Sequence, residues 1–279
     1  MYIIIAILFS CLLFGCKPKT VENVTQGANA PLDLINDIPI KWSDSKLPLT
    51  INISSDFVFN PSDISGGLNP VEQMQKVWDD AVTGKVLFNY PVPRAASKGL
   101  DALSTYRDSV IGVYMSDDWF SNVSSSALAI TQFYAFKQSA SWGDYYELTH
   151  ADIIVNNRDF DFSYNASSTS NYDMPSVLLH EFGHLLGLGH QFDYTVAAVM
   201  QPYMSIWQSN RSLFTNDSQR IQDNYSSSKP ALTASGLVLG SSVKRSSIPD
   251  GTEYHGVIEL YASGECRHYK NGKLIKSHF

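Results

Sequence analysis

Hydrophobic and polar positions follow one another along the chain in a way that predicts strands separated by helices. Residues 47–59 (LPLTINISSDFVF) alternate apolar and polar side chains, which is typical of a half-buried strand. The segments 110–115, 127–136 and 151–156 are apolar runs of strand length, so we expect three further strands there, the first of them buried. Because helical patterns lie between and after these runs, the chain is expected to form an α+β domain.

The first helix is predicted to begin at Asn69. Asn69 can serve as the N-cap, Pro70 suits the first helical position, and Glu72 stands where the carboxylate of a capping box belongs. Apolar side chains then recur on one helix face at Val71, Met74, Val77, Trp78, Ala81 and Val82. This stripe predicts a helix that packs on the sheet as part of the core.

Two further helices are predicted from their first residues. Asp173 with Pro175 marks the start of a strongly apolar helix. Residues 216–225 form a short amphipathic pattern led by Asp217, whose charge favours the positive end of a helix dipole. Three helices are therefore expected in all.

From residue 226 onward the pattern changes to short apolar stretches separated by turn dipeptides. Asp-Gly at 250–251, Ser-Gly at 263–264 and Asn-Gly at 271–272 are typical of tight hairpins. We therefore expect a small β-meander in the C-terminal region, residues 228–279, separate from the α+β domain.

The first fifteen residues carry no charge and are short for a membrane-spanning helix, which predicts a signal peptide over residues 1–15. The residues before Cys16 resemble the bacterial lipobox, in which the cysteine is lipidated and becomes the mature N-terminus. We expect Cys16 to anchor the protein to the cell membrane or outer membrane, facing the periplasm or the exterior, with residues 16–38 as a polar tether. The alternative is an ordinary secretory signal in which Cys16 has no role.

The composition of the 279 residues is that of a globular protein, with 44% hydrophobic and 17% charged residues. The formal net charge is −7 and the lysines and arginines do not cluster, so nucleic acid is not expected as a partner. If Cys11 leaves with the signal peptide and Cys16 is lipidated, Cys266 has no disulfide partner.

The segment HEFGHLLGLGH, residues 180–190, contains a pattern of metal ligands. Because His180 and His184 are four residues apart, they stack on one helix face and can direct both imidazoles at one ion. Glu181 lies beside that ion, where a carboxylate can take a proton from a water molecule. Gly187 allows the chain to leave the helix through a left-handed turn, so that His190 returns as the third ligand.

A zinc site built from these residues could be structural or catalytic. Structural sites are commonly closed by four Cys or His ligands, whereas catalytic sites keep three protein ligands and an open position. No other histidine or cysteine is an obvious fourth ligand, and a structural site has no use for Glu181. The sequence therefore favours one catalytic zinc ion.

The motif, together with AAVMQPY at residues 197–203, resembles the metzincin clan of zinc endopeptidases in its matrixin-like branch. Met200 matches the methionine of the turn beneath the three histidines, and Pro202 matches the proline of the matrixin turn. The likeness covers residues 39–227. It implies a metzincin-type catalytic domain with a twisted, mostly parallel sheet, an antiparallel edge strand and three helices.

The resemblance also implies how a protein or peptide substrate binds. Residues 127–136 would be the edge strand, which pairs antiparallel with an extended substrate through the backbone at Leu128, Ala129 and Ile130. Pro202 and Tyr203 would help to form the wall of the specificity pocket beside the zinc. Calcium is possible in such a domain, but no sequence signal indicates it here.

The chain departs from the matrixin pattern at several positions. Gln191 follows the third histidine where matrixins commonly have Ser or Thr, and no cysteine lies between Cys16 and the catalytic region to cap the zinc. Cys266 could cap it from the C-terminal region, although a lone thiol is more often packed or exposed. Tyr203 comes three residues after Met200, a spacing that favours a pocket wall over a fourth zinc ligand.

Two functions are compatible with these residues. The favoured one is a lipid-anchored, exported zinc endopeptidase in which zinc polarises the scissile carbonyl and Glu181 is the general base. The alternative is a catalytically idle, surface-anchored binding module that retains the zinc site.

Overall fold

The computed structural model describes residues 38–98, 102–226, 247–262 and 266–278. All of these described residues belong to one compact unit. The predicted signal peptide, the tether and Cys16 lie outside the described residues. Among the helices of the described part, none combines the length and the apolar character needed to cross a membrane.

Most strands of the described residues belong to one mixed sheet. Its order is β11-β10-β9-β5-β6-β4-β2-β3, and β1 also pairs with β6. The strands are β1 (Ile40–Lys41), β2 (Asn52–Ser54), β3 (Arg94–Ala95), β4 (Gly112–Ser116), β5 (Ala127–Ala140), β6 (Gly143–Asn156), β9 (Glu253–Tyr261), β10 (Cys266–Lys270) and β11 (Lys273–His278). Strands β1, β2, β3, β4 and β6 pair in parallel, whereas β5 and the C-terminal strands are antiparallel to their neighbours. Two short strands, β7 (Phe162–Ser163) and β8 (Tyr172–Asp173), pair separately.

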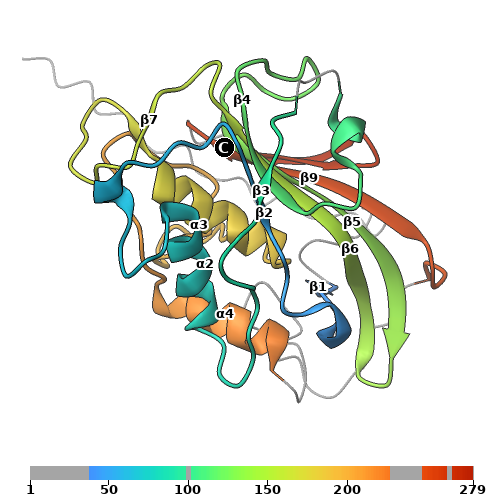
Figure 1. The fold of residues 1–279 in the computed structure, drawn as a ribbon. Coiled ribbons are helices and arrows are strands. Elements are labelled where there is room, and N and C mark those ends of the chain that lie inside the picture. Colours follow the sequence, from blue (N-terminus) through green and yellow to red (C-terminus); the bar gives the residue numbers. More distant parts are fainter. Residues whose placement is uncertain (1–37, 99–101, 227–246, 263–265, 279) are drawn as a thin grey trace, which may run out of the picture. The chain divides into compact units, whose positions relative to one another are not determined.

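The three α-helices of the described residues lie on one side of the sheet (Figure 1). They are α2 (Pro70–Asp79), α3 (Met174–Leu185) and α4 (Thr215–Tyr225). Three short 3₁₀ helices accompany them: η1 (Asp44–Lys46), η2 (Pro61–Asp63) and η3 (Leu103–Tyr106). The main hydrophobic core lies between the helices and the sheet, and every residue of α3 is buried. The predicted α+β class with three helices is confirmed.

The start of α2 is the predicted capping box. The Oδ1 atom of Asn69 accepts hydrogen bonds from the backbone N–H groups of Val71 and Glu72, at 3.0 and 3.1 Å. The Glu72 carboxylate in turn accepts from the Asn69 N–H at 2.8 Å. Both contacts satisfy helix N–H groups that have no partner within the helix. Trp78 is fully buried and its indole donates to the carbonyl of Leu179, which fixes α2 against α3.

The opposite face of the sheet carries a second, smaller core. Segment 102–126 covers it with aromatic residues, among them Tyr106, Trp119 and Phe120, which pack with Tyr114 of β4. Because both faces are covered, the central strands are buried on both sides. This explains why the predicted strands 110–115 and 151–156 are continuous apolar runs.

The strand lengths differ from the predictions. Of residues 47–59, only Asn52–Ser54 form a strand within the described sheet, apart from an isolated bridge at Leu49. In contrast, β5 and β6 are fourteen residues each and form one long hairpin that turns just before Gly143. Gly143 has a φ of 145°, a conformation that glycine adopts readily. Polar residues are frequent between 137 and 150, so no apolar run marks this extension in the sequence.

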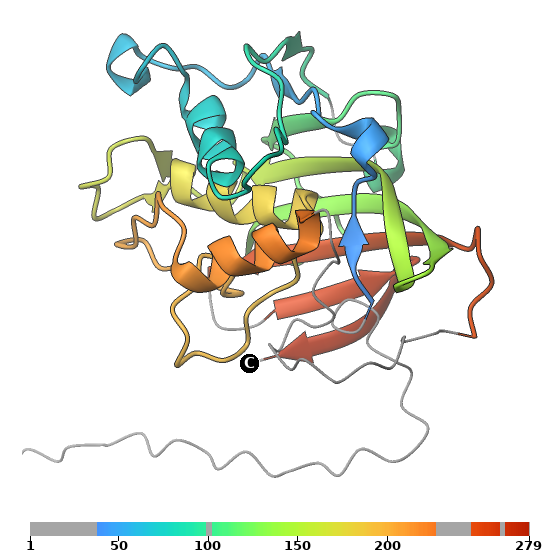
Figure 2. The same cartoon turned by 90° about the horizontal axis from the view of Figure 1, so that it is seen from below.

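The C-terminal strands form the predicted meander, but they are not separate from the α+β domain. Strand β9 pairs antiparallel with β5 from Ala127 to Phe136, so β9–β11 continue the same sheet (Figure 2). Two expectations are therefore wrong. Within the described residues, the strand at 127–136 is not the edge of the sheet, and the region after 228 is not a compact unit of its own. The Asn271-Gly272 turn is confirmed, since both residues have positive φ, 49° and 73°.

Candidate metal centre

Helix α3 brings the motif into the core. Asp173 caps it by accepting from the Ser176 N–H at 3.1 Å, as the sequence predicts, and Pro175 lies in its first turn. Arg211 binds the same Asp173 carboxylate, at 3.0 Å from its Nε to Oδ2, so the segment after the motif is tied to the start of α3. His180, Glu181 and His184 are all buried on this helix.

Gly187 ends α3 through the predicted left-handed turn, with a φ of 90°. Its N–H donates to the carbonyl of His184 at 2.8 Å, and the N–H of Leu188 donates to that of Gly183 at 2.9 Å. A Cβ on Gly187 would lie 2.0 Å from the carbonyl oxygen of Ile40, so β1 packs directly on this turn. The turn reverses the chain, and His190 consequently returns to the other two histidines.

The three histidines meet at their Nε2 atoms. The distances are 2.9 Å between His180 and His184, 3.2 Å between His180 and His190, and 3.0 Å between His184 and His190. Zinc–nitrogen bonds of tetrahedral geometry require about 3.3 Å between the ligand nitrogens. All three side chains are buried, and together they could hold one metal ion.

Carbonyl groups hold two of the imidazoles in the orientation that a metal ligand needs. The Nδ1 of His180 lies 2.8 Å from the carbonyl oxygen of Val199, and that of His184 lies 2.7 Å from the carbonyl oxygen of Leu188. A carbonyl only accepts, so each Nδ1 carries the proton, and in the neutral ring Nε2 presents a lone pair. Lone pairs this close repel one another unless they surround a cation. The donor set therefore fits zinc.

The protonation state of His180 also suits metal binding. Burial lowers the pKa of His180 to about 4, and the hydrogen bond to Val199 only partly opposes that shift. The ring is therefore neutral near pH 7, and an ion does not have to displace a proton from it.

Glu181 follows His180 on α3, is fully buried and is held by one oxygen. The hydroxyl of Thr131 in β5 donates to Oε2 of Glu181 at 2.6 Å, whereas Oε1 has no hydrogen-bond partner among the described residues. In the metal-free chain, burial raises the pKa of Glu181 to about 8, and the Thr131 hydrogen bond opposes this shift. A cation on the neighbouring histidines would favour the ionised form.

Met200 lies beneath the site, as the resemblance implies. It is fully buried, and a Cβ on Gly183 would come within 2.2 Å of its sulfur, so the small residue in α3 lets the methionine approach the helix. Asp217 of α4 fixes this turn, because its carboxylate accepts from the N–H groups of Val199 and Met200 at 2.7 and 3.3 Å. The pattern of the sequence indicated neither the role of Gly183 nor that of Asp217 toward Met200.

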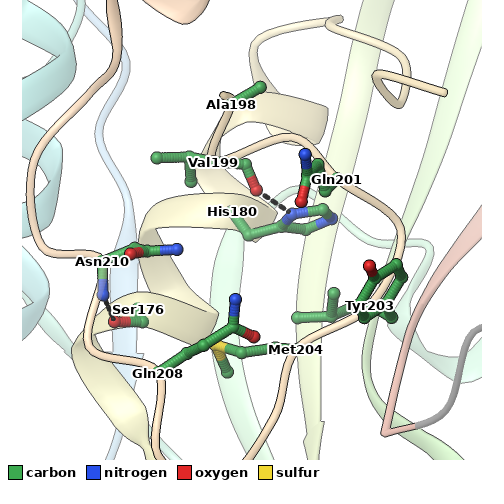
Figure 3. A pocket seen from close by; sticks show the side chains of 10 residues that line it. Ser176, His180, Ala198, Val199, Gln201, Tyr203, Met204, Gln208 and Asn210 are labelled. Atoms are coloured by element: carbon green, nitrogen blue, oxygen red, sulfur yellow. Dashed lines mark hydrogen bonds between the residues drawn. The ribbon is translucent and has the colours of Figure 1, made fainter. Parts of the chain in front are cut away.

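A small pocket opens beside His180 (Figure 3). It is lined by Ser176 and His180 of α3, by residues of the segment after the motif, and by Leu260 of β9. Tyr203 lines this pocket together with Val199 and Met204.

The other predicted pocket residues lie near this pocket without lining it. Pro202 is not among the lining residues, but its carbonyl accepts a hydrogen bond from the N–H of Tyr261 at 3.1 Å. Leu128, Ala129 and Ile130 are buried in β5, where Ala129 lies opposite Leu260 and Ile130 opposite Glu259 of β9. The backbone edge predicted to receive substrate is thus paired with β9. Cys266 lies in β10, and its side chain is outside the described residues.

The fold and the three-histidine centre define a metzincin-like domain. Residues 130–226, from β5 to the end of α4, match the family model described as Matrixin, a zinc metallopeptidase family. This part of the chain is accordingly a matrixin-like domain, which confirms the resemblance noted in the sequence. No curated protein matches the chain.

Proposed function

We propose that this chain is a zinc-dependent endopeptidase. The observation that carries the proposal is the arrangement of Glu181: it is buried on the helix that carries two of the three converging histidines, with one oxygen held by Thr131 and the other without a partner in the described part of the chain. A structural metal site gains nothing from such a carboxylate, because burying a carboxylate with one oxygen unpartnered costs free energy.

His180, His184 and His190 would hold the zinc ion. When bound, zinc supplies Lewis-acid chemistry, which polarises a peptide carbonyl and makes a nearby water a better nucleophile at neutral pH. Glu181 would take the proton of the attacking water on Oε1, the oxygen that Thr131 does not engage, and would return it to the leaving amine. The backbone of β5 and of residues 202–204 would align the extended peptide.

The proposal is tested with the zinc-loaded full chain and a peptide library analysed by mass spectrometry. We expect one zinc ion per chain, and cleavage that is lost with a chelator and restored by zinc. If the wild type and the Leu260→Ala variant both bound one zinc ion per chain but cleaved no peptide, the idle binding module would be favoured instead.

Thr131 is expected to act as a positioning residue for Glu181. A hydrogen bond to a charged group typically contributes about 1.5–3 kcal/mol, so we expect Thr131→Val to lower kcat about tenfold or more. The variant also loses a contact that favours the ionised carboxylate, which moves the acid limb of the pH–rate profile to higher pH. Thr131→Ser keeps the hydroxyl and should restore both properties. If the valine variant and the wild type had equal kcat values and equal pH–rate profiles, Thr131 would not be a positioning residue for Glu181.

We further propose that the protein is exported and lipid-anchored at Cys16. The support is the sequence alone: an uncharged apolar N-terminus, a lipobox-like string and a polar segment after it. Cells expressing the full chain should incorporate a fatty-acid label into the protein, and Cys16→Ala should abolish it. Label retained in the alanine variant would show that Cys16 is not the anchor.

A further inference from the structure

The side of β5 next to the metal centre is covered by a segment of the same chain. Strand β9 runs antiparallel along β5, with Leu260 opposite Ala129 and Tyr261 opposite Ala127. This is the strand, and the direction, along which the proposed function places an extended peptide substrate. The main-chain groups that would align a substrate are therefore already paired.

The same segment also contacts the opposite wall of the groove. The N–H of Tyr261 donates to the carbonyl of Pro202 at 3.1 Å, and the N–H of Met204 donates to the carbonyl of Tyr261 at 2.9 Å. These two hydrogen bonds form an isolated parallel β-bridge between Tyr203 and Tyr261. The end of β9 is thus held between two backbones, antiparallel to one and parallel to the other.

Leu260 lies between these two walls and contributes to the lining of the pocket. Its side chain is 1% exposed and lines the pocket together with His180 of the metal centre. The space that remains beside it has room for about one water molecule. A strand that is paired with both walls and places an apolar side chain at the pocket lies as an extended peptide ligand would lie in such a groove.

We propose that residues 258–262 are an internal ligand of the substrate groove, which keeps the chain latent until a substrate or another event displaces them. This proposal rests on the proposed peptidase function, because that function makes the groove a substrate site. A peptide and this segment need the same N–H and C=O groups, so they cannot bind together. Because the segment is tethered, it competes at a high effective concentration.

The arrangement of β9 allows its end to separate while its beginning stays attached. Strand β10 pairs with β9 only at Gly256, Val257 and Ile258 in the described sheet, so the end of β9 is held by β5, by the bridge to Tyr203 and by the hydrogen bond from the Ala262 N–H to the Ser126 carbonyl. At the other end, Asp250 binds the buried ammonium of Lys137 at 2.6 Å, just before β9 begins. Displacement is therefore expected to start at Tyr261.

The test uses the zinc-loaded full chain and the variants Leu260→Ala and Ile53→Ala. Both substitutions remove a buried aliphatic side chain from the same core, but Ile53 lies in β2, on the far side of β5, β6 and β4 from β9. We expect Leu260→Ala to raise kcat/KM about tenfold or more, because weaker packing increases the displaced fraction. Ile53→Ala should not raise it.

A second measurement does not depend on activity or on the folding of a variant. An extended peptide hydroxamate is added to the zinc-loaded wild type, and amide hydrogen exchange is followed. We expect the amides of residues 258–262 to lose protection when the hydroxamate binds, while those of β4 and β6 keep it. Tight binding with full protection of residues 258–262, or measurable cleavage with equal kcat/KM in the wild type and Leu260→Ala, would overturn the proposal. Loss of protection without cleavage by any variant would instead contradict the peptidase function and leave the internal ligand in place.

Discussion

Replacing Glu181 by glutamine is expected to abolish peptide cleavage while the chain still binds zinc. Glutamine has the same shape and can accept the Thr131 hydroxyl bond, but it cannot take a proton from water. General-base catalysis contributes typically about 10²–10⁴-fold, so kcat/KM should fall by that order. Zinc should remain at one ion per chain, because the three ligand nitrogens belong to other residues.

The readouts for Glu181→Gln are zinc content by elemental analysis and cleavage of the best library peptide. The comparison should be repeated in the Leu260→Ala background, in which the groove is expected to open more often. Activity within a few-fold of the parent chain would mean that Glu181 is not the base. Loss of zinc together with activity would mean that the Glu181 carboxylate is needed to bind the metal, and not only to accept the proton of the water.

The metal centre could be predicted from the sequence because its geometry is local. Two histidines four residues apart on one helix share a face, and Gly187 requires a turn that returns His190 to them. The start of the helix at Asp173 could also be predicted from the sequence, since capping depends on neighbouring residues. These features do not depend on how distant segments pack.

Contacts between distant segments could not be predicted in this way. Thr131 reaches Glu181 across fifty positions, and the only local sign was the polar pair Thr131-Gln132 within an apolar run. Strand β9 pairs with a strand more than a hundred positions earlier, and its alternation fits a free meander as well as a sheet extension. The resemblance implied an open edge at 127–136, so it concealed the covering strand.

The alternative of an idle binding module is less consistent with the interior of the site. A module that only retains zinc would be more stable with a neutral residue at position 181, because a carboxylate oxygen without a partner is expensive to bury. The hydrogen bond from Thr131 to the other oxygen of Glu181 would likewise have no function in such a module. Both features are explained if proton transfer takes place at Glu181.

Replacing Gly187 by alanine is expected to be the most damaging small change outside the zinc ligands. The φ of 90° disfavours any residue with a Cβ, and the added carbon would lie 2.0 Å from the backbone oxygen of Ile40. The left-handed conformation costs about 1–2 kcal/mol and the overpacking about 1–3 kcal/mol more. Since β1 and the turn must move apart, His190 should shift and zinc should bind more weakly.

Gly84→Ala is the matched control for this prediction. Gly84 has a φ of 79°, but a Cβ there would meet nothing within 4 Å, so only the conformational cost of about 1–2 kcal/mol applies. Denaturant unfolding of the metal-free variants separates the two costs, and a zinc titration reports the position of His190. Equal loss of stability in both variants, with unchanged zinc affinity, would show that the contact between Ile40 and the turn does not position the third ligand. A larger loss at Gly187, accompanied by weaker zinc binding, would show that β1 and the left-handed turn together place His190.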